Sequence, residues 1–372
     1  MTNRLPGIAV MICTLVGALP PSAKMAAAAG ETSQKSNLPF VSVDGAIDVP
    51  PIQIPLSVHL SKPAAVEVAE YFNVLNRAAR EGVDVFDAEY VKAFWARGPV
   101  LVQKLYPTKM NETKIAGVRV RVYEPVDGRV DDSHKVLIHL HGGAFITGGP
   151  DSAEAMSIAN KGRFRVVSVD YRQSPDQFPA ASEDVAAVYR ELLKTYRPEN
   201  IGIYGGSAGG FLTAESLAWF QRHALPRPGA AGILCASAEG YRGGDADYLA
   251  RPLIGMLPTD PLAAAGHRGV GDPPPPYFAK ADFSDPLVAP IVSDSVLSKF
   301  PATLFVTSTR AVEMSGAVYT HSKLVSLGVD AELHVWEGLP HSWYTLFPDV
   351  PESQEAVKVI VEFFDKHLGK SK

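Results

Sequence analysis

Residues 203–212 read IYGGSAGGFL, and this stretch decides the fold. An apolar run leads into four glycines around Ser207, and a helical pattern follows. A GxSxG turn between a strand and a helix exposes the serine hydroxyl at the carboxyl edge of a sheet, and it needs Gly205 and Gly209 because side chains there would collide. A serine at a helix start is more often an ordinary cap, so the rest of the chain has to distinguish the two roles.

Strand-like and helix-like segments alternate on both sides of Ser207 from about residue 115 onward. The strand-like runs are VRVRVYEP, KVLIHL, RVVSVDY, IGIYG, AGILCAS, ATLFVTS and AELHVWEG. Runs such as VLIHL are apolar throughout, which is typical of strands buried on both faces, and the βαβ order favours parallel pairing. The sequence therefore predicts an α/β protein with a mostly parallel central sheet flanked by helices.

Further segments are predicted around this core. Residues 30–63 are polar and proline-bearing and are expected to form a linker or an extended wrap. Residues 64–108 are expected to form the helices of a cap, and the core is expected to span residues 109–372. Within the core, residues 240–300 have the Gly, Pro and Asp content of an inserted lid. One cap helix should bury Val68, Phe72, Leu75 and Ala79, and a second should hold Val91, Phe94 and Trp95.

Residues 1–29 have the pattern of a secretory signal peptide. A positive start precedes a mostly apolar stretch from Leu5 to Leu19, and small residues follow around Ala27 to Ala29. The apolar stretch is shorter than the roughly 20 residues that cross a bilayer, which favours cleavage over a membrane anchor. We therefore expect a secreted or periplasmic protein without stable membrane insertion after the signal is removed.

Charge and cysteine content narrow the classes of partner. A net charge of -5 and a pI near 6.1 argue against a nucleic-acid partner and favour a small-molecule substrate. Of the two cysteines, Cys13 lies in the predicted signal peptide, so Cys235 alone would remain and no internal disulfide is expected. The cysteines and histidines lack metal-ligand spacing, so no metal site is predicted.

A second glycine-rich turn follows another buried strand. Residues 139–149 read HLHGGAFITGG, and Gly142 and Gly143 can turn backbone N–H groups toward the edge that carries Ser207. A serine nucleophile needs such donors for the negative oxygen that develops during attack. Together with the N–H of Ala208, these groups form the predicted oxyanion hole, although a plain glycine turn is the alternative.

Three motifs resemble those of a known family. HGGAF, GGSAGG and DYRQSPD are similar to motifs of the hormone-sensitive-lipase-like esterases, the bacterial family IV of the α/β-hydrolase fold, and the resemblance covers residues 64–369. It implies a helical cap, hydrolysis of carboxylic esters without a cofactor, and a preference for short acyl chains. The chain departs from the family pattern at Gly206, where Asp usually precedes the nucleophile, and at Ala144, where a third glycine is common.

The order of catalytic groups in this fold is nucleophile, acid, histidine, so the base should follow the last strand. VWEGLPHSW places His341 there. The acid is less clear, because the family places Asp where this chain has Ala311. Either the acid is missing, or Glu313, longer by a methylene, takes its place; a cap of the next helix is the other role for that carboxylate. Asp285, Asp330 and Glu332 are weaker candidates.

The combined prediction is a serine hydrolase that cleaves carboxylic esters through an acyl-enzyme intermediate, with Ser207 as nucleophile, His341 as base and Glu313 holding the imidazole tautomer. A lactone hydrolase or a carbohydrate deacetylase would use the same triad. A non-catalytic ligand-binding protein on the hydrolase scaffold is the alternative outside enzymes, because Ala311 replaces the usual acid. The sequence does not predict the acyl chain, the alcohol or the oligomeric state.

Overall fold

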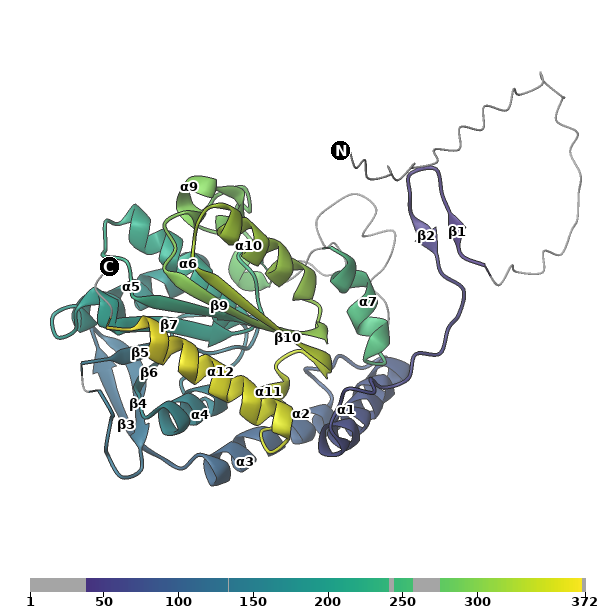
Figure 1. Cartoon of the computed structure of the whole chain (residues 1–372), viewed down its shortest axis with the longest axis horizontal. Helices are drawn as coiled ribbons and strands as arrows, with labels where there is room; N and C mark the ends of the chain where they lie inside the picture. Colours follow the sequence, from purple (N-terminus) through teal and green to yellow (C-terminus); the bar gives the residue numbers. More distant parts are fainter. Residues whose placement is uncertain (1–37, 133, 241–243, 257–274, 370–372) are drawn as a thin grey trace, which may run out of the picture. The chain divides into compact units, whose positions relative to one another are not determined.

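The computed structural model of the protein describes residues 38–132, 134–240, 244–256 and 275–369 (Figure 1). The chain divides into two units, residues 1–53 and 54–372. In the first unit, the strands β1 (Phe40–Val41) and β2 (Ile47–Asp48) pair antiparallel and are exposed. The predicted signal peptide lies outside the described residues.

The second unit is built on an eight-stranded sheet in the order β10-β9-β8-β7-β5-β6-β4-β3. The strands are β3 (Thr108–Ile115), β4 (Val118–Pro125), β5 (Val136–Leu140), β6 (Arg165–Val169), β7 (Ile201–Gly206), β8 (Ala230–Leu234), β9 (Ala302–Arg310) and β10 (Ala331–Pro340). The six strands β5, β6, β7, β8, β9 and β10 run parallel, and β4 is antiparallel to both of its neighbours. This confirms the predicted class, but β3 was missed because its mostly exposed residues TKMNETKI carry no apolar run.

Two layers of helices cover the sheet (Figure 1). One face carries α1 (Lys62–Glu81), α2 (Glu89–Trp95), α3 (Arg97–Leu105), α4 (Ala153–Gly162), α11 (Trp343–Leu346) and α12 (Pro351–His367). The other carries α5 (Ala180–Leu192), α6 (Ala208–Arg222), α9 (Asp294–Leu297) and α10 (Met314–Ser326). Successive strand residues point to opposite layers, as Leu137 and Ile138 do, which is why the parallel strands are apolar throughout.

The first helix, α1, begins where the Ser61 side chain accepts a hydrogen bond from the N–H of Ala64. The backbone N–H of Ser61 also donates to Glu352 on α12 at 2.6 Å, which fixes α1 against the last helix. The buried face of α1 differs from the prediction, because Phe72 and Ala79 are only half-buried. The residues buried instead are Ala64, Val68, Tyr71, Leu75 and Ala78.

The third helix, α3, was not predicted, because Gly98 and Pro99 break the helical pattern near its start. Gly98 is needed for packing, since a Cβ there would lie 2.1 Å from the carbonyl oxygen of Thr345 on α11. The backbone of α3 therefore lies against the segment that follows the predicted base.

The predicted lid at 240–300 is described in part. It holds α7 (Asp245–Leu253), two 3-10 turns (Pro276–Phe278 and Pro290–Val292) and α9. The Asn76 side chain donates to the carbonyl oxygen of Gly255 at 2.7 Å, which joins the end of α7 to α1. The domain limits stay predictions. None of the helices in the described ranges is both long and apolar enough to span a membrane.

Candidate active site

Ser207 lies at the turn between β7 and α6 with φ 57° and ψ -122°, a backbone conformation that costs energy in a residue other than glycine. The flanking glycines allow the turn, because a Cβ at Gly205 or Gly209 would lie 2.2 or 1.8 Å from the carbonyl oxygen of Leu140. Within the described residues, the Ser207 side chain makes no capping hydrogen bond to α6. The cap interpretation is therefore wrong, and the turn presents the hydroxyl at the carboxyl edge of the sheet.

The second glycine turn lies against this serine. A Cβ on Gly142 would be 3.4 Å from the Cβ of Ser207, and Gly143 has φ 116°. No hydrogen bond among the loops and turns that the structure describes uses the N–H of either glycine. Ala208 is the first residue of α6, where helix N–H groups lack partners in the helix itself. These three N–H groups stay the predicted oxyanion donors.

Tyr171 and His141 hold the loop that carries Gly142 and Gly143. The Tyr171 hydroxyl donates to the carbonyl oxygen of His141 at 2.6 Å, and the two rings stack with centroids 4.1 Å apart. Burial lowers the pKa of His141 to about 4, so its ring is neutral near pH 7. Tyr171 and His141 therefore hold the loop and do not supply a charge.

His341 and Glu313 form the central contact of the site. The Nδ1 of His341 lies 2.9 Å from Oε2 of Glu313, and the buried Glu313 also accepts a hydrogen bond from the Thr307 hydroxyl at 3.2 Å through Oε1. Burial lowers the pKa of His341, but the charge and hydrogen bond of Glu313 outweigh it, so the pKa is raised above its ordinary value. Thr307 was missed, because it lies inside an apolar strand.

Glu313 is the carboxylate that the structure brings to the histidine. It makes no capping hydrogen bond to α10, so a cap is not its role within the described chain. Ala311 is fully buried in the turn after β9. The other candidates are engaged elsewhere: Asp285 accepts the N–H of its own loop, Glu332 pairs with a lysine of α12, and Asp330 lies 3.9 Å from a histidine of α12.

A second buried carboxylate lies beside the nucleophile, and no sequence motif pointed to it. Glu154 on α4 accepts the Tyr344 hydroxyl at 2.9 Å through Oε1, and Oε2 lies 3.2 Å from Nε2 of His139. A Cβ added at Gly206 would lie 3.0 Å from the same Oε2. The carboxylate therefore occupies the space next to the residue that precedes Ser207.

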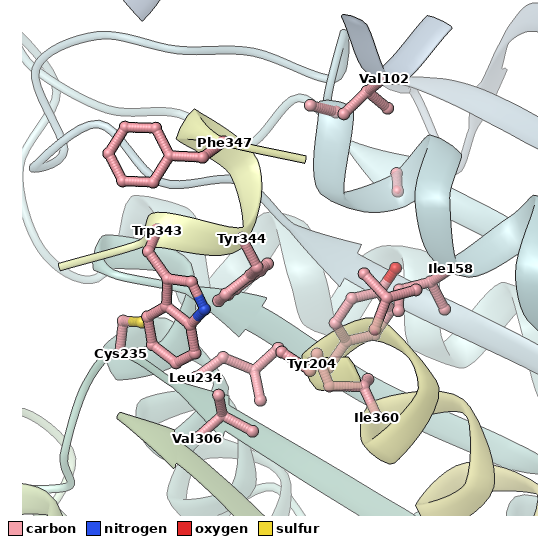
Figure 2. Close-up of a cluster of buried hydrophobic side chains, with 14 of the residues drawn as sticks. Val102, Ile158, Tyr204, Leu234, Cys235, Val306, Trp343, Tyr344, Phe347 and Ile360 are labelled. Carbon is pink, nitrogen blue, oxygen red and sulfur yellow. The ribbon is translucent and has the colours of Figure 1, made fainter. Parts of the chain in front are cut away.

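Cys235 lies directly after β8 and is a free, buried thiol. Figure 2 shows it beside Trp343, within a cluster of buried hydrophobic side chains. Potential ligand atoms of Cys235, Glu313 and His341 all lie within 4.8 Å of one another. Burial, and then the charge of Glu313, raise the pKa of the thiol, so it stays protonated and does not compete with Ser207 as a nucleophile.

A cavity of about 230 Å³ opens at Ser207. Its walls include Gly142, Tyr344 and two residues of the N-terminal helices, Trp95 and Pro99. These helices therefore cover the site. Two other aromatic residues of these helices, Phe72 and Phe94, pack in or against the hydrophobic core instead.

Comparison with known proteins agrees with this geometry. The model of a family described as having the alpha/beta hydrolase fold matches residues 137–345, more than half of the chain. The chain belongs to the α/β hydrolase family. This match confirms the predicted fold class, and together with the esterase relatives described next it confirms the resemblance to hormone-sensitive-lipase-like esterases.

Relatives of this hydrolase carry esterase names. Carboxylesterase/phospholipase LipF of Mycobacterium tuberculosis is 32% identical over 248 residues, which cover 63% of this chain and 62% of LipF. An acetyl-hydrolase of Streptomyces hygroscopicus is 27% identical over 63% of this chain and 77% of its own length. Thus the match spans less than two thirds of LipF.

Solved structures extend the likeness over most of the chain. The crystal structure of esterase E25 superposes with a TM-score of 0.70 at 28% identity and covers 86% of this chain and 98% of E25. An esterase of the bacterial hormone-sensitive lipase family gives a TM-score of 0.66 at 24% identity over 82% of this chain and 99% of its own, a likeness of fold.

Proposed function

We propose that this hydrolase cleaves carboxylic esters of small molecules by acyl transfer through Ser207. The observation that carries the proposal is the 2.9 Å contact between Nδ1 of His341 and Glu313, since it supplies the acid that the sequence pattern at Ala311 lacks. The names of the relatives, which include carboxylesterase and acetyl-hydrolase, support the same reaction class.

In this mechanism His341 accepts the proton of Ser207 as the hydroxyl oxygen attacks the ester carbonyl. The backbone N–H groups of Gly142, Gly143 and Ala208 stabilise the oxyanion. His341 then gives the proton to the departing alcohol, and it activates a water molecule that hydrolyses the acyl-enzyme. Glu313 keeps the proton of the neutral imidazole on Nδ1, which leaves Nε2 free to act as the base.

The substrate we propose carries a short acyl chain. The cavity at Ser207 holds about 230 Å³, and Trp95 and Leu346 are among its walls. Activity should therefore fall from p-nitrophenyl acetate and butyrate to the decanoate. Replacement of Trp95 by Ala removes a large wall and should raise the decanoate rate relative to the acetate rate.

The decisive test is hydrolysis of these esters by the full chain and by Ser207→Ala. The variant should lose about 10⁶-fold in kcat, the scale seen when a serine nucleophile is removed. Ser326→Ala, an exposed serine at the end of α10, is the matched control and should keep full activity. Wild-type activity in Ser207→Ala would refute the mechanism, and an inert wild type that binds the ester would favour the ligand-binding alternative.

We further propose export, with residues 1–29 as a cleaved signal peptide. The positive start, apolar stretch and small residues support it. Sequencing the N-terminus of the protein recovered from a bacterial periplasm or culture medium tests it, because cleavage should leave a start near residue 30. Recovery of the uncut chain in the cytoplasm alone would overturn it.

A further inference from the structure

Three possible metal ligands meet at the carboxyl edge of three neighbouring strands. Cys235 follows β8, Glu313 lies three residues after β9, and His341 follows β10, and these strands are adjacent in the sheet. One ligand atom of each residue lies within 4.8 Å of the other two. Cys235 and Glu313 are buried, and the partly exposed ring of His341 gives access from the solvent.

We propose that Cys235, Glu313 and His341 form an inhibitory binding site for a soft divalent cation, Zn²⁺ or Cd²⁺. The binding is independent of the reaction, whereas the inhibition rests on the function proposed above.

The donor set selects this class of cation. A thiolate, an imidazole and a carboxylate are the ligands that Zn²⁺ takes in proteins, and a thiolate disfavours Mg²⁺ and Ca²⁺. Bonds of about 2.0–2.3 Å from Zn²⁺ to N, O and S would place the ligand atoms roughly 3.5 Å apart in a tetrahedral site. The longest distance between two of these ligand atoms, at most 4.8 Å, must therefore shorten by about 1 Å when the cation binds.

His341 is the residue that would make this adjustment. Its side chain is 36% exposed, whereas that of Glu313 is 2% exposed. His341 also lies in a connection after β10, and its Nδ1 already contacts the carboxylate. A cation between Nδ1 and Oε2 replaces the proton of that hydrogen bond and needs little movement of Glu313.

Occupation of Nδ1 would remove the base. In the resting site the imidazole carries its proton on Nδ1, and Nε2 is the acceptor. When a cation binds Nδ1, this proton moves to Nε2, and the neutral ring can no longer take a proton from Ser207. The Cys235 thiol gives its proton to solvent and binds as thiolate, so each cation bound releases one proton.

Binding is tested without catalysis by titrating Cd²⁺ into the full chain with Cys13→Ser and Ser207→Ala. Removal of Cys13 leaves Cys235 as the sole cysteine, so the ultraviolet charge-transfer band of a Cd–thiolate bond reports on this site alone. We expect a saturable band at one Cd²⁺ per chain that disappears in Cys235→Ser. No band, or a band without saturation at one equivalent, would overturn the site.

Inhibition is tested in the Cys13→Ser protein with p-nitrophenyl acetate and increasing Zn²⁺. Each variant is compared with its own rate after chelation. We expect inhibition that a chelator reverses, no inhibition by Mg²⁺, and at least about a 10-fold weaker effect of Zn²⁺ in Cys235→Ser, because even outer partners of metal ligands change affinity by 10–100-fold.

The two tests separate the possible failures. A Cd–thiolate band, together with no ester hydrolysis by the Cys13→Ser protein that retains Ser207, would sustain the metal site and refute the proposed function. Equal Zn²⁺ inhibition of Cys235→Ser and its parent would refute the site while leaving the esterase intact. Cys235→Ala, which keeps a small side chain but has no ligand atom, should behave like Cys235→Ser in both tests. The melting temperatures of the two variants show whether either substitution destabilises the fold.

Discussion

Replacement of Glu313 by Gln removes the charge that faces the base and keeps the size of the side chain. Oε2 of Glu313 lies 2.9 Å from Nδ1 of His341, and Oε1 accepts the Thr307 hydroxyl. If the Gln carbonyl takes the hydrogen bond from Thr307, its NH₂ group faces Nδ1. The imidazole must then accept at Nδ1 and carry its proton on Nε2, where it cannot serve as a base.

Two effects set the size of the loss. With charge centres about 4 Å apart, an imidazolium and a carboxylate attract each other by about 4 kcal/mol at an effective dielectric constant of about 20. Loss of this attraction in the transition state slows the reaction about 10³-fold. The wrong tautomer accounts for the remainder of a total near 10⁴-fold, the scale seen when a triad acid becomes an amide.

The assay is the pH profile of kcat/KM for p-nitrophenyl acetate, measured with a chelator present. A base acts when unprotonated, and Glu313 raises the pKa of His341, so wild-type activity should be lost as the pH falls through a value above 6.5. Glu313→Gln removes the two larger raising causes. Burial then lowers the pKa of His341 by more than the remaining charge of Glu154 raises it, so the acidic limb should move to lower pH than in the wild type. KM should change little, because Glu313 is not among the cavity walls.

Glu313→Asp and Glu89→Gln complete the experiment. The aspartate keeps the charge but is shorter by a methylene, so it should lose less activity than the amide. Glu89 is an exposed glutamate at the start of α2, and its replacement should have no effect. A Glu313→Gln enzyme within threefold of wild type, or one with an unmoved acidic limb, would refute the role of this carboxylate.

Two further variants test how the site is held. Gly209→Ala should lower the melting temperature sharply or prevent folding, because the added Cβ would lie 1.8 Å from the carbonyl oxygen of Leu140. The control Gly149→Ala, whose added Cβ has its nearest contact at 3.7 Å, should have the melting temperature of the wild type. Equal melting temperatures for the two variants would contradict the close approach at Gly209. Tyr344→Phe removes a hydrogen bond from the buried Glu154 carboxylate and should cost about 1–3 kcal/mol in urea unfolding. An unchanged free energy of unfolding would show that this bond is not needed.

Local patterns were enough to predict the central parts of the fold and the elbow. Gly205 and Gly209 mark a turn through their lack of a side chain, and chain order alone led to His341. Thr307 and Cys235 could not be found in this way, because each looks like a core residue of an apolar run. The place of Cys235 near His341 follows from the adjacency of β8, β9 and β10, and strand order is a long-range property that no local spacing contains. Thr307 is known to contact Glu313 only from the path of the chain after β9.

Two of the three departures from the family pattern have a common physical form. Gly206 and Ala311 stand where the family usually has Asp, yet a carboxylate lies close to each place: Glu154 beside Gly206, and Glu313 on the histidine. Both replacements are one methylene longer than Asp, and both lie at the start of a helix, where the helix dipole favours negative charge. In both places a carboxylate from a helix start lies close to where the family motif would have one: Glu154 comes from a distant part of the sequence, and Glu313 from two residues after Ala311. Motif spacing records only the position of a residue along the chain, so it registers both sites as losses although a carboxylate lies nearby.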